Sequence, residues 1–193
     1  MQTLFLDLDD TFVNTENYIR RVLKNELLPV TEQSVYYMRE LDAYREIMEE
    51  IFSNYDVIPL CDGAEDSLNI LSTEYEVVFC SCAVSDAEEN SKKAFADLYK
   101  KDIIICREDY AKERVDMRGC ILVDDSLDVL EASRADTRIQ IFNPYLAKGL
   151  SYKEYLCGDH LAINLPSVVD YLIGGGISND KSEDLRRTIY KGI

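Results

Sequence analysis

Hydrophobic residues along the chain fall into two patterns, short continuous runs and longer segments with a helical period. The first run, Leu4–Leu6, is too short for a helix and apolar on both faces, which is typical of a buried parallel strand. Further strand-like segments, rich in apolar residues, occupy residues 76–81, 102–106, 119–126 and 138–142. Because helical segments separate these runs, the pattern predicts an α/β fold with a doubly wound, Rossmann-like parallel sheet of about five strands.

The segment after the first strand is much longer than a connection between strands requires. Residues 15–58 repeat apolar positions at helical spacing in two stretches, which Pro29 separates. We therefore expect a helical cap over 15–58, inserted into an α/β core formed by 1–14 and 59–173. The last residues, 174–193, begin with three glycines, and this predicts a flexible tail with a short helix.

The helix that should follow the second strand covers residues 85–100. Its apolar residues include Ala87, Ala94, Phe95 and Leu98. We expect these four side chains to face the core, since a crossover helix packs its apolar stripe against the sheet.

The composition restricts the classes of partner. A chain of 193 residues with 47% hydrophobic residues can form one domain with a sizeable core and a small insertion. Its formal charge of −16 argues against binding to a nucleic-acid polymer or an anionic membrane, because both require a basic surface. No run approaches the roughly 18 apolar residues of a membrane span. We expect a soluble, cytoplasmic protein.

The six cysteines include no CxxC pair. Cys80-Ser81-Cys82 alternates in a way that would suit a soft metal, but no histidine or further cysteine is near in the sequence. The simpler interpretation is that the cysteines are free thiols, several of them buried in strands, and that they do no chemistry.

Candidate chemistry begins where the first strand ends. Asp7 and Asp9 are separated by Leu8, so in an extended backbone both carboxylates point the same way. They would lie at the carboxyl edge of the sheet, where α/β folds bind ligands. A hard cation such as Mg²⁺ explains two close carboxylates, because it prefers oxygen ligands. The simpler alternative is an acidic turn in which Thr11 caps the next helix.

Two other predicted strands end in polar groups. The second ends at Ser81, and the fourth ends at Asp124 and Asp125, with Lys112 on the loop between them. Parallel strands share a carboxyl edge, so these side chains are expected to converge there. Each also has an ordinary interpretation: a hydroxyl bonded to backbone, a solvated lysine, and a helix N-cap that is compatible with metal binding.

Together these residues resemble the motifs of the haloacid dehalogenase superfamily of aspartate-dependent phosphohydrolases. The first motif is matched by Asp7-Leu8-Asp9-Asp10-Thr11, the second by Ser81, the third by Lys112 and the fourth by Asp124-Asp125. The resemblance covers about residues 1–145. It implies a Mg²⁺-dependent phosphatase acting on a small phosphorylated metabolite.

Within that superfamily, the chain is most similar to the 5′(3′)-deoxyribonucleotidase group. The similarity rests on the helical insert after the first motif and on the return segment Pro59–Ala64. It implies that the substrate is a (deoxy)nucleoside monophosphate. A base could stack on one or two of the cap aromatics. These are Tyr18, Tyr36, Tyr37, Tyr44 and Phe52.

The resemblance also implies roles for the site residues. Asp7 would attack phosphorus, and Asp9 would protonate the leaving alkoxide, which requires a raised pKa. Ser81 and Lys112 would bind the phosphate. Mg²⁺ would be held by the motif acids, which are Asp7, Asp9 through its carbonyl oxygen, Asp124 and Asp125.

Three alternatives stay open from the sequence. The chain could hydrolyse or transfer another small phosphorylated metabolite, or it could be a non-catalytic phosphate- or metal-binding protein on the same scaffold. Dehalogenation is disfavoured, because that reaction has no alkoxide for Asp9 to protonate.

Overall fold

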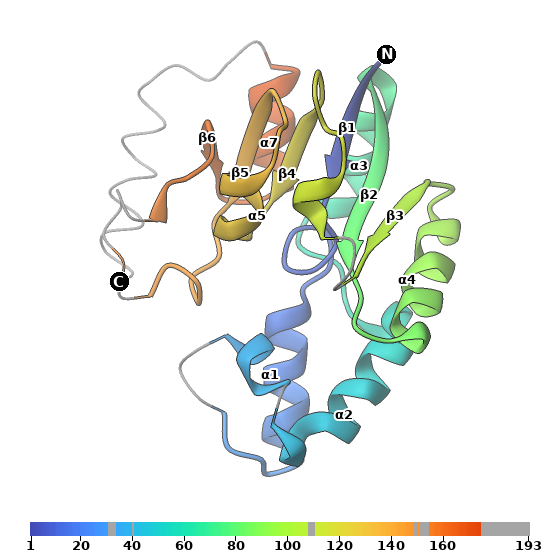
Figure 1. Ribbon diagram of the computed structural model, residues 1–193, viewed down its shortest axis with the longest axis vertical. Coiled ribbons are helices and arrows are strands. Elements are labelled where there is room, and N and C mark those ends of the chain that lie inside the picture. Colours follow the sequence, from blue (N-terminus) through green and yellow to red (C-terminus); the bar gives the residue numbers. More distant parts are fainter. Residues whose placement is uncertain (31–33, 40, 108–110, 149, 151–154, 175–193) are drawn as a thin grey trace.

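A computed structural model describes residues 1–193 apart from 31–33, 40, 108–110, 149, 151–154 and 175–193. Its centre is a six-stranded parallel sheet with the order β3-β2-β1-β4-β5-β6 (Figure 1). The strands are β1 (Gln2–Leu6), β2 (Tyr75–Cys82), β3 (Ile103–Cys106), β4 (Ile121–Asp124), β5 (Thr137–Ile141) and β6 (His160–Ala162). The doubly wound, Rossmann-like fold expected from the sequence is confirmed.

The sixth strand was not anticipated. It contains only His160, Leu161 and Ala162, and it pairs with β5 in the register Ile139↔His160. The His160 ring also stacks on Tyr171 at a centroid distance of 3.9 Å. Three residues at a sheet edge are too few to give a recognisable hydrophobic run, because their pairing depends on a neighbour that is distant in sequence.

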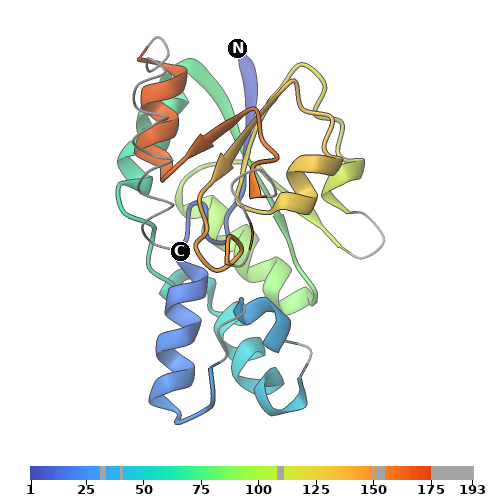
Figure 2. The same ribbon diagram turned by 90° about the vertical axis from the view of Figure 1, so that its left-hand side faces the viewer.

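Both faces of the sheet are covered by helices (Figure 2). The helices α3 (Ala64–Glu74), α4 (Asp86–Leu98) and α7 (Leu165–Leu172) pack on one face; α5 (Leu127–Ala132) and η3 (Lys112–Arg114) pack on the other. Alternation along β1 explains this arrangement. Leu4 and Leu6 are buried in the first cluster, whereas Phe5 is buried in the second.

The buried face of α4 differs from the expected one. Its buried residues are Glu88, Lys92, Phe95 and Ala96. Of the four side chains expected to face the core, only Phe95 is buried; Ala87, Ala94 and Leu98 are exposed. The prediction failed because it assumed that charged residues face solvent, whereas this helix buries a charged pair against the partners described below.

The described residues of the segment 15–58, called the cap segment here, lie beyond the carboxyl edge of the sheet (Figure 1). It contains α1 (Thr15–Asn25), η1 (Val35–Met38), α2 (Asp42–Ser53) and η2 (Tyr55–Val57). Its two ends leave the core together, since Val13 and Leu60 form an antiparallel bridge and the Asn14 amide donates to the Pro59 carbonyl at 2.8 Å. The segment therefore begins and ends beside the last residues of the first motif.

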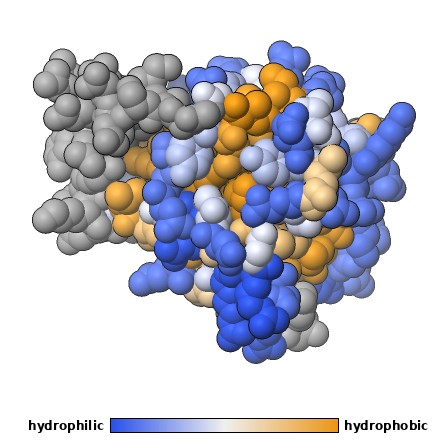
Figure 3. Space-filling model, turned by 90° about the horizontal axis from the view of Figure 1, so that it is seen from above, coloured by the Kyte–Doolittle hydropathy of each residue, from blue (hydrophilic) through white to orange (hydrophobic). Residues whose placement is uncertain are grey.

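Hydrophilic residues dominate the face opposite the cap segment, with a narrow hydrophobic band among them (Figure 3). Among the described residues, no helix combines the length and the apolar composition that crossing a membrane requires. All six cysteines are free thiols. The tail expected over 174–193 lies, from residue 175 onward, outside the described residues.

Candidate active site

The site is built where the strand order reverses, between β1 and β4. Open α/β sheets form a crevice at this point, because the neighbouring connections leave in opposite directions. Asp7 follows β1 and its amide donates to the Val123 carbonyl of β4 at 2.9 Å. Lys112 lies between the strand ends: its Nζ donates to the Asp7 carboxylate and lies 2.7 Å from Asp124 Oδ2. All three side chains are buried.

Three carboxylates, those of Asp7, Asp124 and Asp125, have oxygen atoms within 4.8 Å of one another. Burial, together with repulsion from neighbouring carboxylates, raises the pKa of Asp7 and of Asp125 well above the usual range, although Lys112 opposes the increase. One lysine is too little positive charge for three buried acids. An all-oxygen group of this kind suits a divalent cation, so these residues fit the metal that the motifs imply.

Hydrogen bonds hold the two acids at the carboxyl end of β4 in place. Asn143 Nδ2 donates to Asp125 Oδ2 at 2.6 Å, and the Ser126 amide donates to Asp124 Oδ1 at 2.9 Å. Asn143 follows β5, and sequence reasoning did not single it out. Ligand carboxylates are commonly oriented by such partners, so Asn143 belongs to the site.

The Asp9 carboxylate is turned away from this group. Its Oδ1 accepts from Tyr55 Oη at 2.7 Å and from Thr15 Oγ1 at 2.9 Å, while its Oδ2 lies 2.5 Å from Lys92 Nζ. Burial alone would raise the pKa of Asp9, but the charge of Lys92 and the three donated hydrogen bonds lower it. The sequence-based expectation of a raised pKa is therefore wrong for this state.

Ser81 lies beside the ion pair of Asp9 and Lys92. Its fully buried Oγ is 3.1 Å from Lys92 Nζ and 3.4 Å from Asp9 Oδ2. The structure thus brings Asp7, Lys112, Asp124 and Asp125 into one group. It places Ser81 and Asp9 in a second group around Lys92.

Lys92 is the main residue that the sequence analysis missed. It is fully buried on α4 and forms an ion pair with Glu88 as well as with Asp9. One signal was available: Glu88, Lys92, Phe95 and Ala96 follow a helical spacing of three or four, so the pair shares the face of an apolar residue. A charged pair on the inner face of a helix indicates that another buried polar residue, distant in the sequence, contacts the pair.

A cavity of about 450 Å³ is lined by all four residues of the first group and, from the second group, by Asp9. Ser34 and Tyr36 reach it from the cap segment. The remaining lining includes four apolar side chains: Leu127, Val129, Leu146 and Leu150. Among the described residues, Lys112 is the sole basic side chain in this lining. The lining thus combines acidic and apolar side chains.

Among the cap aromatics whose side chains are described, only Tyr36 lines this cavity. Within the part of the chain that the structure describes, its buried hydroxyl has no hydrogen-bond partner. Tyr44 is buried and donates to the Pro29 carbonyl, Phe52 is buried in the core, and Tyr18 lines a separate cavity between α1 and α2. Tyr36 is therefore the aromatic side chain best placed to contact a ligand.

Cys82 should react selectively with iodoacetamide. It is exposed and lines the cavity. A hydrogen bond with Cys106, aided by the charges of Lys112 and Lys92, lowers its pKa to about 7, although partial loss of solvent around the thiol opposes this shift. Since the thiolate is the nucleophile, alkylation should accelerate as the pH rises through about 7. Burial and nearby acids raise the pKa of Cys61 to about 12, so Cys61 should react much more slowly.

Peptide mass spectrometry after brief treatment measures both thiols in one sample. Alkylation of Cys82 should block the entry of ligands into the cavity. The Cys82→Ala protein should keep its ligand binding after the same treatment. Equal labelling of Cys61 and Cys82 at neutral pH would contradict the assignment of a reactive thiol.

Comparison with known proteins agrees with the geometry at the level of the fold. No protein-family model matches the sequence, and no curated protein sequence matches it. Among solved structures, a protein assigned as a haloacid dehalogenase-like hydrolase from Burkholderia xenovorans superposes with a TM-score of 0.63 at 15% identity. The match covers 89% of this chain and 96% of that one.

Two further structures extend this similarity. A protein assigned as a HAD hydrolase from Bacillus subtilis, bound to magnesium, gives a TM-score of 0.58 at 16% identity, covering 89% of this chain and 98% of that one. A haloacid dehalogenase-like family protein from Streptococcus pneumoniae gives 0.57 at 16% identity, with the same coverage of 89% and 98%. The chain has the fold of the haloacid dehalogenase-like hydrolases.

Proposed function

We propose that the protein is a Mg²⁺-dependent phosphomonoesterase that acts through an aspartyl-phosphate, with a (deoxy)nucleoside monophosphate as its substrate. The observation that carries this proposal is the position of Asp7. Its buried carboxylate lies at the switch point of the sheet, beside Lys112 and two further acids. That is the arrangement that in-line attack on a phosphate requires, with positive charge beside the transferring oxygens.

The reaction has two halves. An Asp7 oxygen attacks phosphorus, the bond from phosphorus to the ester oxygen breaks, and the leaving oxygen takes a proton from Asp9. Water then attacks the aspartyl-phosphate, gives its proton to Asp9, and phosphate leaves. Lys112 and Ser81 would bind the phosphate oxygens. Mg²⁺ held by Asp7, Asp124, Asp125 and the Asp9 carbonyl would supply the remaining charge neutralisation.

The lowered pKa of Asp9 makes it ionised in the free protein. This state suits the second half, in which Asp9 accepts a proton from water. For the first half, the proton can arrive with the substrate, because a phosphate monoester has a second pKa of about 6 and binds partly as its monoanion. That proton would pass to the Asp9 carboxylate, which would then give it to the leaving oxygen.

The cavity supports a substrate with an uncharged, partly apolar leaving group. Within the described lining, Lys112 is the one cation and it is occupied by Asp7 and Asp124, so nothing there would neutralise a second anionic group on the substrate. Tyr36 and the leucines offer apolar surface for a nucleoside. A metabolite with a charged leaving group, such as a carboxylate, fits this lining less well.

The test is phosphate release from a panel of esters, with and without Mg²⁺. We expect turnover of nucleoside monophosphates to exceed that of phosphoglycolate and of sugar bisphosphates, and to stop after treatment with a chelator. Added Mg²⁺ should restore it. Lack of phosphate release from every ester, although the protein binds Mg²⁺ and phosphate, would favour the non-catalytic alternative.

A further inference from the structure

A continuous series of ion pairs joins the cap segment to Asp9. Its members alternate in charge: Arg39 in the cap segment, Glu88 and Lys92 on α4, and Asp9 after β1. The Arg39 guanidinium donates to both Glu88 oxygens, one of them at 3.4 Å. Glu88 Oε1 lies 3.1 Å from Lys92 Nζ, which lies 2.5 Å from Asp9 Oδ2. The four charges therefore form one connected unit.

This unit is largely withdrawn from water. The side chains of Glu88 and Lys92 are each 1% exposed, and that of Arg39 is 20% exposed. Burying charges is costly, and a buried ion pair often stabilises a fold no better than apolar residues of the same size. Stability alone thus gives a weak reason for charges on the inner face of α4. The pairs do, however, fix the positions of the groups at their end.

Lys92 contacts two side chains that the proposed reaction needs, those of Asp9 and Ser81. Besides Asp9, its Nζ lies 3.1 Å from Ser81 Oγ and donates to the Cys82 carbonyl at 2.7 Å. These contacts fix the ammonium at the end of β2. One side chain therefore orients the proposed proton donor and a proposed phosphate ligand together.

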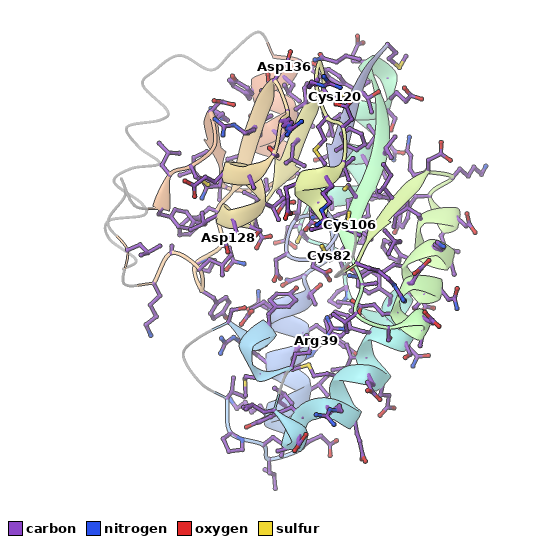
Figure 4. All side chains as sticks on the ribbon, viewed as in Figure 1. Arg39, Cys82, Cys106, Cys120, Asp128 and Asp136 are labelled. Atoms are coloured by element: carbon purple, nitrogen blue, oxygen red, sulfur yellow. The ribbon has the colours of Figure 1, made fainter. Side chains whose placement is uncertain are left out.

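Arg39 connects this arrangement to the cap segment. Its guanidinium lies over the Phe52 ring of α2 at 4.0 Å, and α2 packs against α4. Figure 4 shows Arg39 in the cap segment beyond the strand end where Cys82 is labelled. Glu88 is held from the other side, since its Oε2 accepts from the Val84 amide at 2.9 Å. Arg39 thus reaches Lys92 through a fixed carboxylate.

We propose that Lys92 is a positioning residue for Asp9, and that Arg39 anchors Lys92 from the cap segment through Glu88. This inference rests on the proposed function, because it assigns Lys92 an effect only through Asp9. Lys92 holds the Asp9 carboxylate where the leaving oxygen departs. Arg39 maintains that geometry only while the cap segment packs on α4, so protonation of the leaving group requires a docked cap segment.

The experiment compares a nucleoside monophosphate, whose alkoxide needs a proton, with nitrophenyl phosphate, whose phenolate does not. Lys92→Met should lower kcat for the nucleotide by about 10²-fold and for the nitrophenyl ester by less than about 10-fold. Arg39→Gln should have the same selectivity with a smaller loss, about 10-fold for the nucleotide, since Lys92 remains. The conservative variant Arg39→Lys should keep most of the nucleotide turnover that Arg39→Gln loses.

The matched control is Arg45→Gln. Arg45 also belongs to the cap segment and is ion-paired, with Asp42, but it is 59% exposed and its partner lies in the same helix. It should leave the rates on both esters unchanged. Arg39→Gln removes a partly exposed group, so it tests the proposal even if Lys92→Met fails to fold.

A double-mutant cycle separates positioning from a purely structural role. In an Asp9→Asn background, Lys92→Met should change the nucleotide rate by less than about 3-fold, because residues that act through one another are not additive. Additive losses, equal losses on both esters, or an Arg39→Gln that behaves like Arg45→Gln would overturn the proposal. An unmodified protein that hydrolyses neither ester would instead refute the proposed function.

Discussion

Asp7→Asn should reduce the hydrolysis of every phosphate ester to the background rate, a loss of about 10⁴-fold or more. The amide oxygen is a poor nucleophile, so no aspartyl-phosphate can form, even when the leaving group departs easily. The measurement is steady-state phosphate release from nitrophenyl phosphate and from a nucleoside monophosphate. Trapping of ³²P-labelled protein in acid should succeed for the native chain and fail for the variant.

The matched control for this variant is Asp116→Asn. Asp116 is 62% exposed and forms its ion pair with Arg118, so its replacement should leave the rate unchanged. Circular dichroism would show that Asp7→Asn retains the fold. Appreciable turnover by a folded Asp7→Asn protein would remove the nucleophile from the proposal and return the site to a phosphate-binding scaffold.

Asp9→Asn should have an effect that depends on the leaving group. General acid–base assistance is typically worth about 10² to 10⁴-fold, so a nucleoside monophosphate should lose up to that much. Nitrophenyl phosphate should lose distinctly less, because its phenolate leaves without a proton. The kcat of each ester, measured across several leaving groups, gives the comparison directly.

A metal-binding role for the Asp9 carboxylate leads to a different result. In that case both esters would lose activity alike, and excess Mg²⁺ would partly restore them. The structure favours the first outcome, since the Asp9 side chain contacts Lys92, Tyr55 and Thr15 and lies outside the group formed by Asp7, Asp124 and Asp125. Equal losses with recovery in Mg²⁺ would contradict the acid role.

The sequence by itself determined the parallel α/β fold and the positions where polar groups end its strands. Both are local properties. Leu4–Leu6 and Ile121–Val123 are apolar on both faces, and each forms a buried strand in the middle of the sheet. The carboxyl ends of parallel strands share one edge, and this rule alone placed Asp7, Ser81 and Asp124 near one another.

Only the tertiary structure decided which charges face each other. Lys92 and Leu98 both occur on α4. Their side-chain polarity alone predicts an exposed lysine and a buried leucine, and the fold does the reverse. Lys92 is buried because Asp9 and Glu88, brought to it by β1 and by α4 itself, provide its partners. The same contact reverses the expected pKa shift of Asp9. Strand β6 and the partnership of Asn143 with Asp125 arise in the same way.

The physical reason is the range of the interactions. Burial of an apolar run depends mainly on its own residues, so a pattern in the chain predicts it. The position and pKa of a buried charge depend on partners dozens of residues away, such as Lys92 for Asp9, because the Coulomb interaction is strong only where the fold excludes water. The order of residues along the chain is therefore enough to predict which apolar runs are buried. The position and pKa of Asp9 depend on how the cap segment and α4 pack around it.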